Sequence, residues 1–108
     1  MTNLLMTVDL NKHRLRIHKK TMAALGNPTH VILIVNPESH MIAVKHAVSQ
    51  DRQAQRLQSN FELYSKSLVS ALLDIFPQQP TTACCNLEGT LIPLEQMVCF
   101  PLESAVWL

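Results

Sequence analysis

The sequence predicts a β-dominated α+β protein that folds as one domain over residues 1–108. Three observations support this prediction: an alternating basic segment, a β-branched apolar run with an apolar partner, and a partial repeat of both in the second half. A chain of 108 residues is long enough for one compact domain and short for two. Apolar residues make up 47% of the chain and aromatic residues only 5%, so we expect a largely aliphatic core.

The segment "KHRLRIH", residues 12–18, alternates in the way that a half-buried strand does. His13, Leu15 and Ile17 share one parity and are expected to face the core. The other parity is polar and basic, and it comprises Lys12, Arg14, Arg16 and His18. Residues 6–10 alternate as well, which indicates a further strand near the N-terminus.

A short helix and a hairpin are expected after this strand. Residues 19–25, "KKTMAAL", favour a helix, and Gly26 suits the position just past a helix end. Residues 31–35, "VILIV", and residues 41–44, "MIAV", then predict two paired strands joined by a turn at 36–40.

The second half of the chain repeats this order by residue class. Residues 61–71 align with residues 15–25, which places Phe61 at the position of Leu15. The repeat therefore predicts a strand followed by a short helix. The alternative is that residues 61–76 form one amphipathic helix in a fold without internal symmetry.

A second hairpin completes the predicted repeat. Its strands would be residues 82–87, "TACCNL", and residues 97–100, "MVCF", joined by a longer loop at 88–96. The resulting organisation is a basic unit at residues 12–48, a polar linker at residues 49–60 and a divergent second unit at residues 61–108.

Charge is distributed unevenly between the two halves. Up to residue 58, eight Lys or Arg residues face three Asp or Glu residues, a net charge of +5. From residue 59 onward, one Lys faces five acidic residues, a net charge of −4. This asymmetry is typical of a protein that binds nucleic acid on one side, or of two halves that attract each other.

The basic unit resembles a known family. "RLRIHKKTMAALG" followed by "VILIVNPESHMIAV" resembles the AbrB/SpoVT/MraZ swapped-hairpin module over residues 12–46. The resemblance implies a small swapped-hairpin, or double-split, β-barrel built from two strand–helix–hairpin units. Such a barrel closes between two chains or, with a tandem copy, within one chain. The resemblance also implies a DNA-binding protein of the transcription-regulator or antitoxin type.

The resemblance implies DNA contacts from the strand and from the loop near the helix. The matched positions are Arg14, Arg16, Lys19 and Lys20. In the second copy, Glu62, Ser65 and Lys66 stand at the positions of the last three. Because only one unit is basic, a homodimer would be needed to present two equivalent faces.

The same cations suit phosphate recognition on physical grounds. Lys12, Arg14 and Arg16 are two residues apart, so on a strand they would project from one face at intervals of about 6–7 Å. The arginine fork also matches the major-groove edge of guanine, and Lys19 and Lys20 would add to the field. These five residues are the candidate DNA-binding residues. The alternative is a solvated face without a ligand.

The sequence offers no motif for catalysis or for a cofactor. With only two glycines, phosphate-cradling loops are excluded, and we expect neither an enzyme nor a bound cofactor. The five histidines lack metal-ligand spacing, so we expect no metal. Adjacent Cys84 and Cys85 would face opposite sides of a strand, one buried and one exposed. Without a signal peptide or a membrane-spanning run, we expect a cytoplasmic protein with no membrane partner.

A second hypothesis is a non-enzymatic interaction or structural module, antitoxin-like or self-associating, with no DNA binding. The basic half would then dock onto an acidic protein surface. The apolar residues Val106, Trp107 and Leu108 at the end of the chain would mark a contact. The alternative for Trp107 is that it folds back onto the core.

Overall fold

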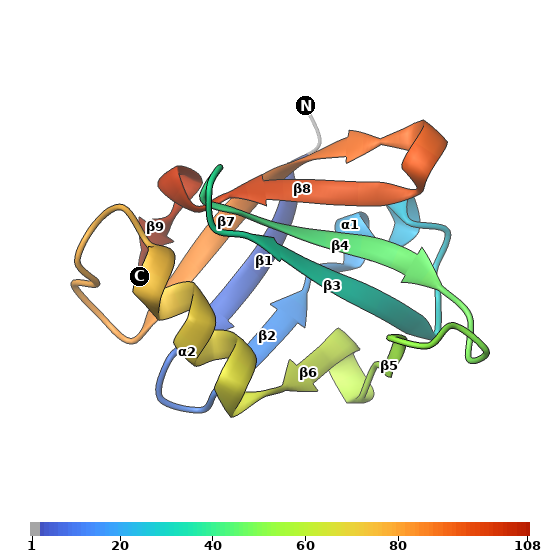
Figure 1. The fold of residues 1–108 in the computed structure, drawn as a ribbon, viewed down its shortest axis with the longest axis horizontal. Coiled ribbons are helices and arrows are strands. Elements are labelled where there is room, and N and C mark those ends of the chain that lie inside the picture. The colour runs from blue at the N-terminus through green and yellow to red at the C-terminus, as the bar shows by residue number, and fades with distance from the viewer. Residues whose placement is uncertain (1–2) are drawn as a thin grey trace.

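The computed structural model describes residues 3–108 as a single-chain, nearly closed antiparallel β-barrel with two helices (Figure 1). The predicted β-dominated α+β class is confirmed at this level. The strands are β1 (Leu4–Asp9), β2 (Arg14–Ile17), β3 (His30–Asn36), β4 (Met41–Ala47), β5 (Gln55–Arg56), β6 (Glu62–Tyr64), β7 (Cys84–Ile92), β8 (Met97–Pro101) and β9 (Val106–Trp107). The α helices are α1 (Lys19–Ala24) and α2 (Lys66–Ile75).

Eight strands follow one another around the barrel in the order β5-β3-β4-β8-β7-β1-β2-β6, and β9 pairs with β7 outside this path. Along the chain, the order strand–strand–helix–strand–strand occurs twice, first as β1-β2-α1-β3-β4 and then as β5-β6-α2-β7-β8. Four antiparallel pairings join the first run to the second: β1 with β7, β3 with β5, β2 with β6 and β4 with β8. The two halves of the chain therefore interlock in one barrel.

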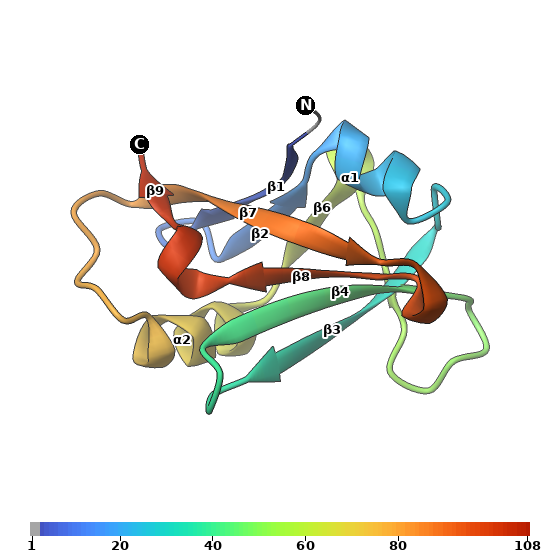
Figure 2. The same ribbon diagram turned by 90° about the horizontal axis from the view of Figure 1, so that it is seen from above.

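The core is formed by every second side chain along the strands, on the face that points into the barrel, as the alternating pattern predicts. Leu15 and Ile17 of β2 are buried, and so are Met6 and Val8 of β1. The further N-terminal strand is thus confirmed. The helices lie on opposite sides of the barrel (Figure 2), and each turns an apolar face towards it. The buried apolar positions of the helices are Met22, Val69 and Leu72.

Residues 61–76 do not form one helix. β6 occupies residues 62–64, and α2 begins at Lys66 because Ser65 caps it, its Oγ accepting a hydrogen bond from the N–H of Leu68 at 3.2 Å. A strand followed by a helix is therefore confirmed here. Phe61 differs from its aligned counterpart Leu15, however, because Phe61 is exposed whereas Leu15 is buried.

The predicted strand over residues 12–18 is too long. β2 covers Arg14–Ile17, and the chain before it turns, with His13 at φ 52°. Asp9 causes this turn: its Oδ1 accepts hydrogen bonds from the N–H groups of Asn11 and Lys12, each at 3.0 Å. Lys12 therefore lies in the β1–β2 turn and not on the strand.

The predicted boundaries of the second hairpin are also wrong. Residues 88–92, predicted as a loop, extend β7 to Ile92, and a 3-10 turn at Pro93–Glu95 leads to β8. The predicted linker at 49–60 contains the short strand β5. The first hairpin agrees with the prediction, with β3 and β4 paired from His30 to Ala47.

The C-terminal segment folds back. β9 pairs with β7, and the rings of Trp107 and Phe76 lie 5.3 Å apart between centroids. The predicted contrast between adjacent cysteines is confirmed, since Cys85 is buried and Cys84 is partly exposed. Neither helix within residues 3–108 has the length and apolar character needed to cross a membrane.

Candidate nucleic-acid interface

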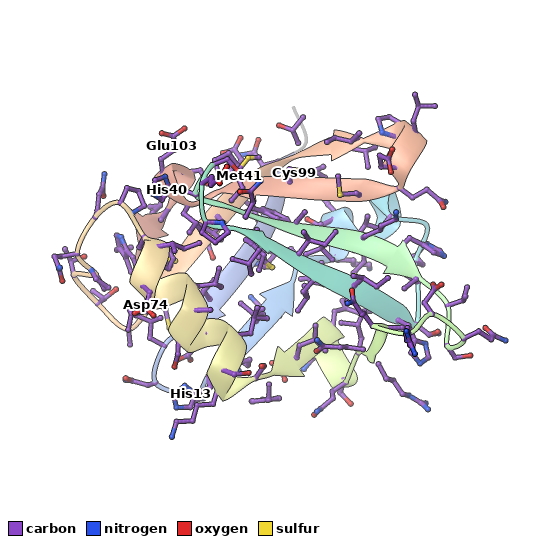
Figure 3. All side chains as sticks on the ribbon, in the orientation of Figure 1. His13, His40, Met41, Asp74, Cys99 and Glu103 are labelled. Carbon is purple, nitrogen blue, oxygen red and sulfur yellow. The ribbon has the colours of Figure 1, made fainter. Side chains whose placement is uncertain are left out.

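The structure brings together three of the five predicted cations. Arg16 near the end of β2 and Lys19 and Lys20 at the start of α1 are all exposed. Lys12 is exposed too, but it lies in the turn at the other end of β2, beside His13, which Figure 3 shows far from α1. Lys12 is therefore separated from this cluster.

Arg14 has internal partners. Its Nη2 lies 3.4 Å from Oδ2 of Asp9, and its Nη1 lies 3.2 Å from Oε2 of Glu62. Tyr64 donates its hydroxyl proton to the other oxygen of Glu62 at 3.2 Å. Only 22% of the Arg14 side chain is exposed. Arg14 therefore ties β1, β2 and β6 together, and its guanidinium is less available to a ligand than that of Arg16.

Asp9 is the buried carboxylate among the contacts of Arg14. We call Arg14, its partners Asp9 and Glu62, and Tyr64 the Asp9 network. Burial by itself raises the pKa of Asp9, but the N–H of Lys12, the Cys84 thiol and the charge of Arg14 outweigh burial, and the pKa lies below its ordinary value. Asp9 is therefore a firmly ionised carboxylate, which holds both the β1–β2 turn and Arg14.

Three hollows that share lining residues lie next to one another at the α1 end of β2. The first, of about 410 Å³, extends from Lys20 to His18 and Lys19. The second, of about 270 Å³, shares those two residues and ends at Phe61. The third, of about 280 Å³, shares Phe61 and reaches Arg56. We call these three hollows together the basic groove.

The basic groove is strongly cationic. Its charged lining residues are Arg16, Lys19, Lys20 and Arg56. Within residues 3–108, no carboxylate lines the groove and none of these four cations forms an ion pair. Glu62 is the cross-strand partner of Arg16, but its carboxylate is bound to Arg14 and Tyr64. The positive field of the groove is therefore largely uncompensated.

Phe61 lines both the second and the third hollow of the basic groove. Asn60 and Phe61 both have left-handed backbone conformations, with φ of 61° and 59°. Hydrogen bonds hold this turn: the N–H of Phe61 donates to the carbonyl of Gln58 at 3.0 Å, and the N–H of Gln58 donates to the carbonyl of Glu62 at 2.9 Å. Phe61 as a whole residue is 36% exposed.

His18 forms the wall between the first two hollows with a defined tautomer. The Thr7 hydroxyl donates its single proton to Oδ1 of Asn86 at 2.6 Å, so it must accept from Nε2–H of His18 at 2.7 Å. Nδ1 of His18 has no hydrogen-bond partner in the described part of the chain. Burial, assisted by the charge of Arg16, lowers the pKa of His18, which favours the neutral ring.

Sequence reasoning missed Arg56, Asn60 and Phe61 as members of this site. Arg56 lies in a segment predicted to be a linker, and it reaches the groove because β5 pairs with β3. A strand of two residues has no detectable periodicity. The one available signal was Asn60, since asparagine tolerates the left-handed conformation that presents the next side chain.

A second surface lies on the outer face of β3, β4 and β8. An apolar hollow of about 170 Å³ is lined by residues that include Ile34, Met41 and Cys99. Figure 3 shows Met41 and Cys99 close together on this face. Burial raises the pKa of the Cys99 thiol, so this cysteine is not an activated nucleophile. Among residues 3–108, no group of three or more His, Cys, Asp or Glu residues is arranged to hold a metal ion.

No family model, curated protein or solved structure matches this chain.

Proposed function

We propose that the protein is a non-enzymatic, DNA-binding protein of the transcription-regulator type, which contacts nucleic-acid phosphates through the basic groove. One observation carries this proposal: four cations line the adjoining hollows of the basic groove, and none of them has an acidic partner within residues 3–108. Unpaired cations gathered in a concave site attract a polyanion more strongly than the same charges scattered on a convex surface.

The proposed roles of the predicted residues differ. Arg16, Lys19 and Lys20 bind phosphates, and Arg16 is the residue best suited to guanine, because its fork is not engaged by a carboxylate. Lys12 supplies an outlying backbone contact beyond the far end of β2. Arg14 supports the site by holding β2 against β6.

The resemblance to the AbrB/SpoVT/MraZ swapped-hairpin family is part of this proposal. The repeated element order and the four pairings between the first and second runs support a tandem swapped-hairpin barrel closed within one chain. Because the second half has Glu62 and Ser65 where the first is basic, each chain offers one basic groove. We propose that a homodimer presents two such grooves to a DNA site.

The test is the salt dependence of duplex binding, measured by fluorescence anisotropy at about 50 and 200 mM salt. We expect affinity to fall steeply with salt. Replacing Arg16 and Lys19 together by alanine should weaken binding and reduce the slope of log affinity against log salt by about 2, one for each phosphate that the variant no longer neutralises.

The matched control is Arg52→Ala, which removes an exposed arginine that does not line the groove. This variant should bind as the parent does. The proposal is wrong if the parent binds neither duplex nor single-stranded nucleic acid at the lower salt, or if the folded double variant binds with unchanged affinity and slope.

The apolar hollow favours a second candidate, a protein-interaction module. Leu94, at the tip of the β7–β8 hairpin, is 98% exposed, and the hollow near Met41 and Cys99 presents further apolar surface. Binding through such a surface would be nearly insensitive to salt, which distinguishes it from phosphate contact.

A further inference from the structure

We propose that the basic groove binds unpaired nucleotides, with a base stacked on Phe61 and the flanking phosphates held by Arg16 and Lys19 on one side and Arg56 on the other. This inference rests on the proposed nucleic-acid binding and specifies its ligand class: a single-stranded segment in place of an intact duplex.

Phe61 occupies a central position among the hollows. It lines both the second and the third hollow and therefore lies between them. A large aromatic side chain of a small, aliphatic protein would contribute most in the core, yet Phe61 is exposed in a left-handed turn. The fold thus maintains a costly conformation that presents this ring.

Cations lie on both sides of Phe61 along the basic groove. Lys20, Lys19 and Arg16 lie on one side of Phe61, and Arg56 lies on the other. A polyanion that spans the cations on both sides would therefore pass Phe61. Grooves that bind single strands combine a cationic track with aromatic stacking in this way, because an unpaired base exposes its π-face.

The central hollow suits a single base in both size and polarity. Its volume of about 270 Å³ is near the lower end of the range for small-ligand pockets, roughly 300 Å³, which suits one planar base better than a duplex edge. Asn60 lines the same hollow, and its amide supplies both donors and an acceptor for the edge of a base. A duplex keeps its bases stacked and cannot place one there without extruding it.

The experiment compares fluorescein-labelled oligonucleotides by anisotropy at about 50 mM salt. The probes are an oligo(dT) of about 12 nucleotides, the same strand annealed to oligo(dA), and oligo(U) of equal length. We expect oligo(dT) to bind roughly tenfold or more tightly than the duplex. Tighter binding of oligo(U) would equally support an unpaired ligand and assign it to RNA.

Three substitutions at one position isolate stacking from apolar bulk. Phe61→Tyr keeps the ring and should retain single-strand affinity. Phe61→Leu and Phe61→Ala lose the ring and should weaken that affinity roughly fivefold or more. Circular dichroism verifies that each variant is folded. The control is Leu94→Ala, since Leu94 is an exposed apolar residue outside the groove, and this variant should bind unchanged.

The outcomes separate this inference from the proposed function. Equal or tighter binding of the duplex, or unchanged single-strand affinity in folded Phe61→Leu, overturns the inference and leaves phosphate binding by the groove intact. If none of the three probes binds, both proposals are wrong.

Discussion

Two arginines on one strand have different surroundings and therefore different roles. Arg14 and Arg16 are two residues apart and share a parity, so alternation alone gives them the same role. Their neighbours distinguish the two arginines. Asp9 at the end of β1 and Glu62 on β6 both pair with Arg14, whereas Arg16 has no ion pair among the described residues. Surface alternation thus identifies candidate cations, and the acidic neighbours determine which of them are free to bind.

The Asp9 network leads to a prediction about stability and pH. Because its folded pKa lies below the ordinary 3.8, ionised Asp9 stabilises the fold above about pH 4, and this contribution is lost as pH falls through the lowered folded pKa. Asp9→Asn should reduce the free energy of unfolding by about 1–3 kcal/mol near neutral pH. Urea unfolding of parent and variant at about pH 7 and pH 3 measures this, and the difference between them should shrink at the lower pH.

Two results would contradict this interpretation of Asp9. One is equal stability of parent and Asp9→Asn near neutral pH. The other is a stability difference that stays constant into the acid range, which would show that the charge of the carboxylate is not what the fold uses.

At the scale of elements, β7 determines the shape of the barrel. Its first part pairs with β1, from Cys84 to Gly89, and its last three residues pair with β8. Gly89 marks the change of partner. An added Cβ there would lie 2.6 Å from Cγ1 of Val98 and 2.7 Å from the ring of Phe100. Glycine is therefore needed because the buried side chains of β8 lie against the backbone of β7 at this point.

Gly89→Ala should consequently destabilise the fold by about 1–3 kcal/mol, the usual cost of overpacking. Thermal unfolding followed by circular dichroism is the measurement. The matched control is Thr90→Ala on the exposed outer side of the same strand, which should change stability by no more than about 0.5 kcal/mol. Equal effects of the two substitutions would contradict the close approach at Gly89.

For the whole molecule, the interlocking of the two halves of the chain brings their opposite net charges into contact. Two ion pairs join the basic half to the acidic half, Arg14 with Glu62 and Lys45 with Glu95. Both interpretations of the asymmetry therefore have a structural counterpart. The halves attract each other through these pairs. Of the six cations of the basic half without an ion pair among the described residues, four line the groove, whereas Lys12 and Arg52 do not.

The sequence predicted those elements that carry a strong local pattern. β2 alternates between core and solvent, whereas β3, β4 and β8 are short apolar runs, and all four were located to within a few residues. The end of β7 was mistaken for a loop because residues 88–92 contain Gly89 and precede Pro93, both of which are ordinary turn signals. β5 has two residues and is defined by its partner β3, so local sequence does not reveal it.

The candidate site was predictable in composition but not in geometry. Arg16, Lys19 and Lys20 were identified because they are consecutive or alternate within one short segment. Arg56 and Phe61 join them from about 40 residues further along the chain, through pairing of β5 with β3 and a left-handed turn. Such long-range placement follows from the closed barrel and not from any local pattern.

The most direct test of the central claim, that the basic groove is the nucleic-acid site, is chemical-shift mapping. ¹H–¹⁵N spectra of the labelled protein would be recorded during titration with an oligonucleotide of about 12 nucleotides at low salt. We expect the largest amide shifts in residues 16–20 and 56–61, which line the groove. Shifts confined to the outer face of β3, β4 and β8, or no shifts at saturating oligonucleotide, would contradict the claim.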